Sequence, residues 1–135
     1  TRLEKVIGVV NEENQITQLR ELDLCHAVVL ADATNAIDVY EKVMAVNKEA
    51  VDVTINVVNV QNTEMSCILI TKDTGTVYFF SMATSFTKAA LGAEGVGSDV
   101  TMIIGNGYTK GHAELTLNLV NNVPKTKELF ERIYT

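Results

Sequence analysis

Val51-Asp52-Val53-Thr54-Ile55-Asn56-Val57-Val58-Asn59-Val60 is the segment from which the architecture of this 135-residue chain is inferred. It is rich in β-branched residues and contains neither glycine nor proline. The run is too short to span a membrane, so it predicts a strand that is buried on both faces. Helical patterns precede and follow it, which predicts that the strand lies in the middle of a parallel sheet.

Runs of the same type recur along the chain and alternate with helical patterns. The other expected strands are Lys5–Val10, Ala27–Ala31, Thr76–Met82 and Val100–Ile104. A helix opens at Asn62 or Thr63 after the central run, and Pro124 fits the first turn of the last helix. Because crossovers between parallel strands are right-handed, this order predicts one α/β domain, with a parallel sheet of about five strands and helices on both faces.

Local signals predict where individual helices begin, end and face the core. Asn11 is a candidate N-cap of the first helix and Thr87 of the short helix that ends near Glu94. Asp73-Thr74-Gly75 is a turn sequence that is expected to end the helix before the fourth strand. The inner face of the second helix is expected to carry Ile37, Tyr40, Val43 and Met44.

Composition and charge narrow the class of protein. Apolar residues make up 47% and charged residues 21% of the chain, as in ordinary globular proteins. A formal charge of −6 argues against nucleic acid or an anionic membrane as a partner. Cys25 and Cys67 lack ligand-like spacing and are expected to be small buried side chains. No signal peptide, transmembrane run or lipidation motif is recognisable, so the cytoplasm is the expected location.

Two stretches of the sequence contain several glycines each. Gly105-Asn106-Gly107-Tyr108-Thr109-Lys110-Gly111 follows a strand and opens a helix, so it is a phosphate cradle, a tight turn near some other ligand, or a purely structural turn. Its spacing is not the dinucleotide fingerprint. Gly92–Gly97 precedes a strand and is expected to be a plain loop.

Polar residues follow several of the expected strands, where ligands of parallel sheets bind. Asp32 is expected either to accept a hydrogen bond from a ribose or adenine or to cap the next helix. Asn11 stands where an acidic residue would hold ribose hydroxyls, and its neutral side chain would exclude a 2′-phosphate less strongly. Ser81 and Thr84 could hydrogen-bond a ligand.

Neither histidine has a catalytic partner that is recognisable in the sequence. His26 is expected to face solvent, and His112 is a weak candidate for general acid/base chemistry. No catalytic triad, paired-carboxylate site or metal cluster is readable, so no metal site is expected.

Several long stretches resemble the L-erythro-3,5-diaminohexanoate dehydrogenase family. They are Val53–Val60 followed by Asn62–Ser66, Val77–Gly97 and Gly105–Lys110, and the resemblance covers essentially the whole chain. It implies an NAD- or NADP-dependent oxidative deamination in the lysine fermentation of anaerobic bacteria. It further implies an architecture like that of alcohol dehydrogenases without their zinc. We expect the oxidoreductase to be a homo-oligomer.

The resemblance also implies that the chain is an incomplete Rossmann-like nucleotide-binding domain, spanning residues 1–135. The first strand of the family's sheet and the glycine-rich turn after it have no counterpart here. In the sheet order 3-2-1-4-5-6, Val6–Val10 would be strand 2 and Val53–Val58 strand 4. We therefore expect these two strands either to pair with each other or to receive a strand from another segment or chain. The chain alone is expected to be inactive and to bind dinucleotide poorly.

Strand-end geometry and the resemblance together predict the residues near a cofactor. On the adenosine side these are Asn11, Asp32 and Ala33. On the nicotinamide side they are Asn59, Val60, Ser81, Met82, Gly105 and Asn106. No catalytic residue is assigned. The alternative functions are a non-enzymatic α/β module that binds a small ligand or oligomerises, and a flavodoxin-like domain.

Overall fold

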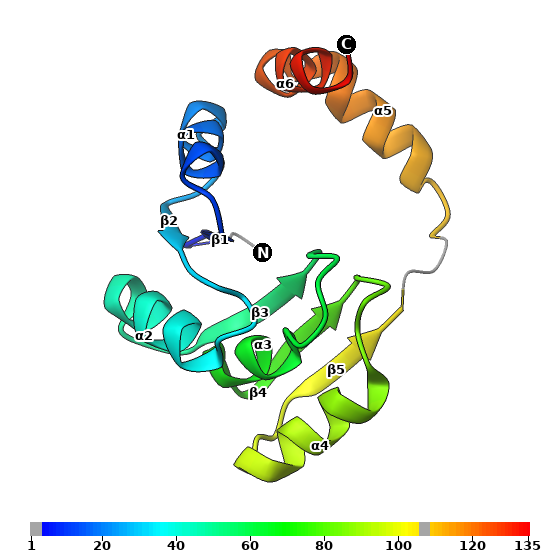
Figure 1. Cartoon of the computed structure of the whole chain (residues 1–135). Coiled ribbons are helices and arrows are strands. Elements are labelled where there is room, and N and C mark those ends of the chain that lie inside the picture. Colours follow the sequence, from blue (N-terminus) through cyan, green and yellow to red (C-terminus); the bar gives the residue numbers. More distant parts are fainter. Residues whose placement is uncertain (1–3, 106–108) are drawn as a thin grey trace.

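A computed structural model describes residues 4–105 and 109–135 (Figure 1). Strands and helices alternate through most of the chain, as predicted. The elements are β1 Ile7–Val10, α1 Glu13–Leu22, β2 Ala27–Leu30, α2 Ala36–Asn47, β3 Val51–Asn56, α3 Glu64–Ile70, β4 Thr71–Phe79, α4 Phe86–Val96, β5 Thr101–Ile104, α5 His112–Asn122 and α6 Pro124–Tyr134.

All strand pairs among the described residues are parallel, which confirms the predicted α/β class. The strands nevertheless form two sheets, β1-β2 and β3-β4-β5, and not one. β1 pairs with β2, and β3 pairs with β4. Because β1 and β3 lie in different sheets, the prediction that β1 and β3 pair with each other is wrong. The arrangement fits a Rossmann-like sheet that is interrupted between β1 and β3. A strand from elsewhere remains the other prediction for this position.

The central run is an edge strand, and not a strand buried on both faces. β3 ends at Asn56, so Val57 to Val60 lie beyond it. Val53 and Ile55 are 57% and 66% exposed, whereas Asn56, which points to the opposite face, is only 5% exposed. The physical reason is that β3 has a hydrogen-bonded neighbour on one side alone, and its outward face is left largely uncovered.

The opposite face of the three-stranded sheet holds a well-packed core. Val77 and Phe79 of β4 are fully buried. They pack against Ile68 of α3 and against Ala89 and Ala93 of α4. In Figure 1, α3 and α4 lie together on this side of β4 and β5. From Gly75 to Phe79, buried and half-buried residues alternate along β4 with the two-residue period of a strand.

A second core joins the two sheets through α2. Val39 and Val43 of this helix are buried with Val29 of β2 and Ile70 of α3. The predicted inner face was therefore only partly right: Val43 is buried, but Ile37 is 60% and Tyr40 42% exposed. Val39 and Val43 are four residues apart and share one helix face, and Ile37 lies on another.

Two helix starts are shifted by one or two residues from the predicted caps. Glu12, and not Asn11, occupies the N-cap of α1, and the Gln15 side chain accepts the N–H groups of both. The hydroxyl of Ser85, and not of Thr87, caps α4. α6 opens with Pro124 as predicted.

The turn predicted at residues 73–75 lies inside β4. α3 ends at Ile70 and β4 starts directly at Thr71, but the pairing with β3 becomes regular only from Thr76. Thr74 takes a positive φ of 67° in this irregular stretch. The fourth strand also ends earlier than predicted, at Phe79, so Ser81 and Met82 belong to the loop that follows.

Gly75 tests how tightly this irregular stretch is packed. A β-carbon there would lie 2.8 Å from the carbonyl oxygen of Asp52 and 2.9 Å from that of Lys72, both backbone atoms. We expect Gly75→Ala to lower the free energy of unfolding by about 1–3 kcal/mol, because neither oxygen can move without disturbing the sheet. Gly95→Ala is the control: nothing lies within 4 Å of that position in α4, and alanine should stabilise the helix. Urea unfolding that gave both variants the same stability would contradict this account.

Candidate functional site

The carboxyl ends of β3, β4 and β5 meet at one edge of the sheet. The register places Asn56 beside Phe79 and Phe79 beside Ile104. Hydrogen bonds continue one residue further, from the Phe80 N–H to the Asn56 carbonyl at 2.9 Å and from the Gly105 N–H to the Phe79 carbonyl at 3.2 Å. The segments that follow these strands therefore start side by side, as a ligand site of a parallel sheet requires.

The start of α3 links the ends of three strands. The Asn56 amide donates to the Thr63 hydroxyl at 2.8 Å, which ties the end of β3 to the helix N-cap. The Glu64 carboxylate accepts the Ser85 N–H at 3.0 Å, from the loop after β4. The Ser66 hydroxyl donates to the Ala33 carbonyl at 2.6 Å, after β2. Thus the carboxyl ends of both sheets lie around one helix terminus.

This junction was missed in the sequence. Asn56, Thr63, Glu64 and Ser66 are all 5% exposed or less, and each has a side-chain hydrogen bond in the structure. In the sequence these residues form a polar helix start, and this pattern is too common to indicate a functional site. What the pattern lacked was any signal that Glu64, a charged residue, would be buried.

The predicted adenosine-side residues lie after β1 and β2. Ala33 is half-buried and takes part in the junction, whereas Asn11 and Asp32 are exposed. The pairing of Val10 with Leu30 sets Asn11 and Asp32 at the same edge of the two-stranded sheet. These positions fit a ligand group that approaches the strand ends, and their role in cofactor binding stays a prediction.

Asp32 stabilises its own turn and does not cap α2. Its carboxylate accepts the N–H of Thr34 at 2.9 Å and the hydroxyl of Thr34 at 2.7 Å. The hydroxyl bond and then the N–H bond hold the pKa of Asp32 below its usual value, so the side chain is an anion at neutral pH. The cap of α2 is Asn35, whose side chain accepts the Asp38 N–H.

The predicted nicotinamide-side residues follow β3, β4 and β5. Asn59 and Val60 are exposed, Ser81 is half-buried and its hydroxyl accepts the Ala83 N–H at 3.1 Å, and Met82 is 82% exposed. Gly105 is half-buried at the end of β5. Asn106 lies outside the described residues, as do the next two positions of the glycine-containing stretch, so the alternatives for that stretch stay open.

Large apolar side chains are concentrated beyond these strand ends. Val57, Phe80, Met82 and Phe86 are between 45% and 82% exposed. Exposed apolar groups beside a few fixed polar groups are the composition of small-molecule sites. The edge could therefore contact a flat organic ring as well as hydrogen-bonding groups.

The remaining candidate residues do not form a site. His26 is exposed as predicted, and its Nδ1 accepts the Val6 N–H at 2.9 Å. His112 is exposed at the start of α5 and its Nδ1 lies 2.7 Å from the Thr109 carbonyl oxygen. Within residues 4–105 and 109–135, no group of histidine, cysteine, aspartate and glutamate side chains could hold a metal ion.

The two cysteines should differ in reactivity. Burial raises the pKa of the Cys67 thiol to about 12, and this residue is buried as predicted, whereas Cys25 is half-buried. Because the thiolate is the reactive form, we expect Cys25 to be alkylated by iodoacetamide at pH 7.5 well before Cys67. Mass spectrometry of the labelled peptides measures both rates. The Cys25→Ser variant gives the alkylation rate of Cys67 alone. Equal alkylation rates for the two cysteines in the folded chain would contradict the burial of Cys67.

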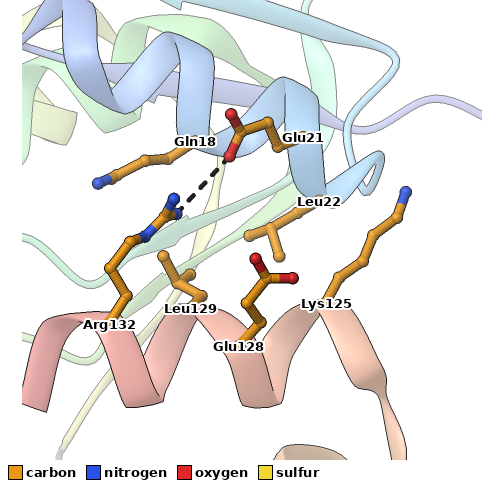
Figure 2. Close-up of a pocket in the computed structure, with 7 residues that line it drawn as sticks. All are labelled: Gln18, Glu21, Leu22, Lys125, Glu128, Leu129 and Arg132. Carbon is orange, nitrogen blue, oxygen red and sulfur yellow. Dashed lines mark ion pairs between the residues drawn. The ribbon is translucent and has the colours of Figure 1, made fainter. Parts of the chain in front are cut away.

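Two surface grooves of the described chain lie away from the carboxyl ends of the strands. Figure 2 shows a groove between α1 and α6, across which Arg132 faces Glu21. The groove has a volume of about 280 Å³, and the two side chains form an ion pair at 3.6 Å. Both side chains of that pair are more than half exposed, so the pair contributes little stability. A second groove, of about 260 Å³, includes Thr71 and Ser98 at the opposite edge of the sheet. We regard neither as the functional site.

The parallel strands, their helical crossovers and the shared carboxyl edge place this chain among Rossmann-like α/β proteins. Comparison with known proteins narrows the class. The chain is 53% identical over 131 residues to the L-erythro-3,5-diaminohexanoate dehydrogenase of Acetoanaerobium sticklandii. It is 52% identical over the same length to the enzyme of that name from Fusobacterium nucleatum. The resemblance inferred from the sequence is thus confirmed.

The chain spans less than half the length of these relatives. They cover 96% of this chain but 38% of each relative. No family model matches the chain. Among the described residues, none of the helices is both long and apolar enough to cross a membrane.

Proposed function

We propose that this chain forms part of the nucleotide-binding half of an NAD(P)-dependent dehydrogenase that deaminates 3,5-diaminohexanoate. The identity of 53% over 131 residues to a dehydrogenase of that name carries the proposal. The shared edge of β3, β4 and β5 supports it, because dinucleotides bind at such edges. The cytoplasmic location, the role in lysine fermentation and assembly as a homo-oligomer are parts of the same proposal.

The residues at the edge fit a dinucleotide in part. The ionised, exposed Asp32 suits hydrogen bonds from ribose or adenine, and the apolar Val60 and Met82 suit the face of a nicotinamide ring. The segments after β1, β2, β3 and β4 contain no glycine before the next helix, so a turn that could approach the pyrophosphate must come from outside these residues.

The chain's own contribution to the reaction would be positioning. A bound nicotinamide cofactor would supply the oxidant: a hydride would leave the carbon that bears the substrate's 3-amino group, a proton would leave the nitrogen, and water would then replace ammonia at that carbon. Ser81 and Gly105, on adjacent strand ends, would flank the ring. Asn11, Asp32 and Ala33 would flank the adenosine, and no side chain of this chain is assigned to proton transfer.

A chimera tests the proposal directly. The matched segment of the Acetoanaerobium enzyme is replaced by this chain, and reduction of NAD and NADP is measured with 3,5-diaminohexanoate. We expect activity in the chimera, whereas the chain alone should be inactive and bind NADH more weakly than micromolar, since the segments after β1, β2, β3 and β4 contain no glycine-rich turn that could approach the pyrophosphate. A folded but inactive chimera would contradict the proposed function. Micromolar NADH affinity of the chain alone would contradict the expected weak binding.

One observation favours an oligomerising module as the second candidate. Ile55, Tyr78 and Ile103 stand in one row across the outward face of the sheet, and Ile55 and Ile103 are 66% and 46% exposed. Such a face suits contact with another protein surface. A stable dimer in sedimentation velocity, with no nucleotide affinity in either the chain or the chimera, would favour this reading.

A further inference from the structure

Glu64 is a charged residue that the fold has buried at the candidate site. It is 3% exposed and is the first residue of α3. A buried carboxylate is costly unless it accepts hydrogen bonds. Its Oε1 accepts the backbone N–H of Ser85 at 3.0 Å, across 21 residues of sequence. Its place in the first turn of a helix also suits a negative charge.

The bond from Ser85 reaches the loop that follows β4. Ser85 is the N-cap of α4, and its hydroxyl accepts the Lys88 N–H at 3.3 Å. Lys88 in turn donates from Nζ to the Asn62 side chain, just before α3. The loop between β4 and α4, residues 80–85, is thus held to the start of α3 at its far end, and through the sheet at Phe80.

The same loop contains a buried polar group without a hydrogen bond to any described residue, which disfavours the observed loop conformation. The Thr84 hydroxyl is the one buried side-chain polar atom that lacks a hydrogen-bond partner among the described residues. An unsatisfied buried hydroxyl disfavours the conformation that buries it. Bonds to charged groups are stronger than neutral ones, so the neighbouring Ser85–Glu64 bond is well suited to hold the loop in place.

We propose that Glu64 is a positioning residue: its carboxylate fixes the loop 80–85 and thereby sets where Ser81 and Met82 stand at the strand edge. The part that concerns a nucleotide rests on the proposed function. The part that concerns the loop does not, because it follows from the burial of Glu64 and its bond to Ser85.

Amide hydrogen exchange of the 135-residue chain, followed by NMR, tests the loop. We expect Glu64→Ala to speed exchange of the Ser85 N–H by roughly ten-fold or more, while Val77 and Phe79 in β4 keep their protection. Glu64→Gln keeps an acceptor oxygen and should restore most of the protection. Glu64→Asp keeps the charge but shortens the side chain, and it should resemble the alanine variant.

Two further variants distinguish the effect of the Glu64 carboxylate from a general loss of negative charge and from a change in loop packing. Glu41→Gln removes an exposed carboxylate on α2 and should leave Ser85 unchanged. Thr84→Val removes the unsatisfied hydroxyl and should leave Ser85 at least as protected as before. Unchanged Ser85 exchange in Glu64→Ala and Glu64→Asp would overturn the proposal. So would equal loss of protection in Thr84→Val, because loop packing would then be the cause.

Millimolar NADH tests the link to the site. We expect weak binding to shift the amide signals of Ser81 and Met82 in the unmodified chain and in Glu64→Gln, and to shift them less in Glu64→Ala. Equal shifts in all three would overturn the positioning role. Shifts absent from the unmodified chain would overturn the nucleotide placement, and the Ser85 exchange would still decide whether Glu64 fixes the loop.

Discussion

Replacing Phe79 by alanine is expected to lower the free energy of unfolding by about 3–5 kcal/mol, a large share of a domain's usual stability. Phe79 is 0% exposed in β4 and packs with Ile68 and Ala89, so truncation removes apolar contacts and leaves a cavity. Urea unfolding followed by circular dichroism gives the value.

Phe86→Ala is the matched control for this measurement. The same side chain is lost, but Phe86 is 72% exposed at the start of α4. Exposed substitutions of this kind change stability by about 0.5 kcal/mol or less. If the two variants unfolded at the same urea concentration, the core between β4, α3 and α4 would not be what stabilises the chain.

Placing a charge at Ile55 is expected to abolish assembly of the chimeric enzyme while leaving the isolated chain folded. Ile55 lies on the outward face of β3 and is 66% exposed here. In the chimera we expect a strand to enter between β1 and β3 and the segments next to it to cover this face. A buried lysine without a partner would then cost several kcal/mol. Size-exclusion chromatography and activity of the Ile55→Lys chimera measure the loss.

Leu91→Lys controls for the added charge. Leu91 is 62% exposed on α4, so the two substitutions begin from nearly equal exposure. We expect Leu91→Lys to be tolerated both in the chain and in the chimera. An Ile55→Lys chimera that assembled and reacted as well as the Leu91→Lys chimera would show that the outward face of β3 stays uncovered.

The candidate site was only partly predictable, and the residues show why. Asp32, Ala33, Ser81 and Gly105 could be chosen because carboxyl ends of parallel strands share an edge, which follows from element order alone. Glu64 could not be chosen, since its hydrogen-bond partner, the Ser85 N–H, is 21 residues away in the sequence. The sequence predicted either a ligand contact or a helix cap for Asp32. The local turn that Asp32 forms instead depends on the position of Thr34, which donates both hydrogen bonds.

The sequence by itself determined the order of strands and helices, their parallel direction and the edge at which polar residues gather. These follow from local patterns: β-branched runs, helical spacing of apolar residues, and capping residues. Only the tertiary structure decided that β3 is an edge strand, that α2 buries Val39 and exposes Ile37, and that Glu64 lies inside the protein. Burial depends on which neighbours are present. A hydrophobic run indicates that a strand face can be buried, but only packing against neighbouring segments determines whether it is buried.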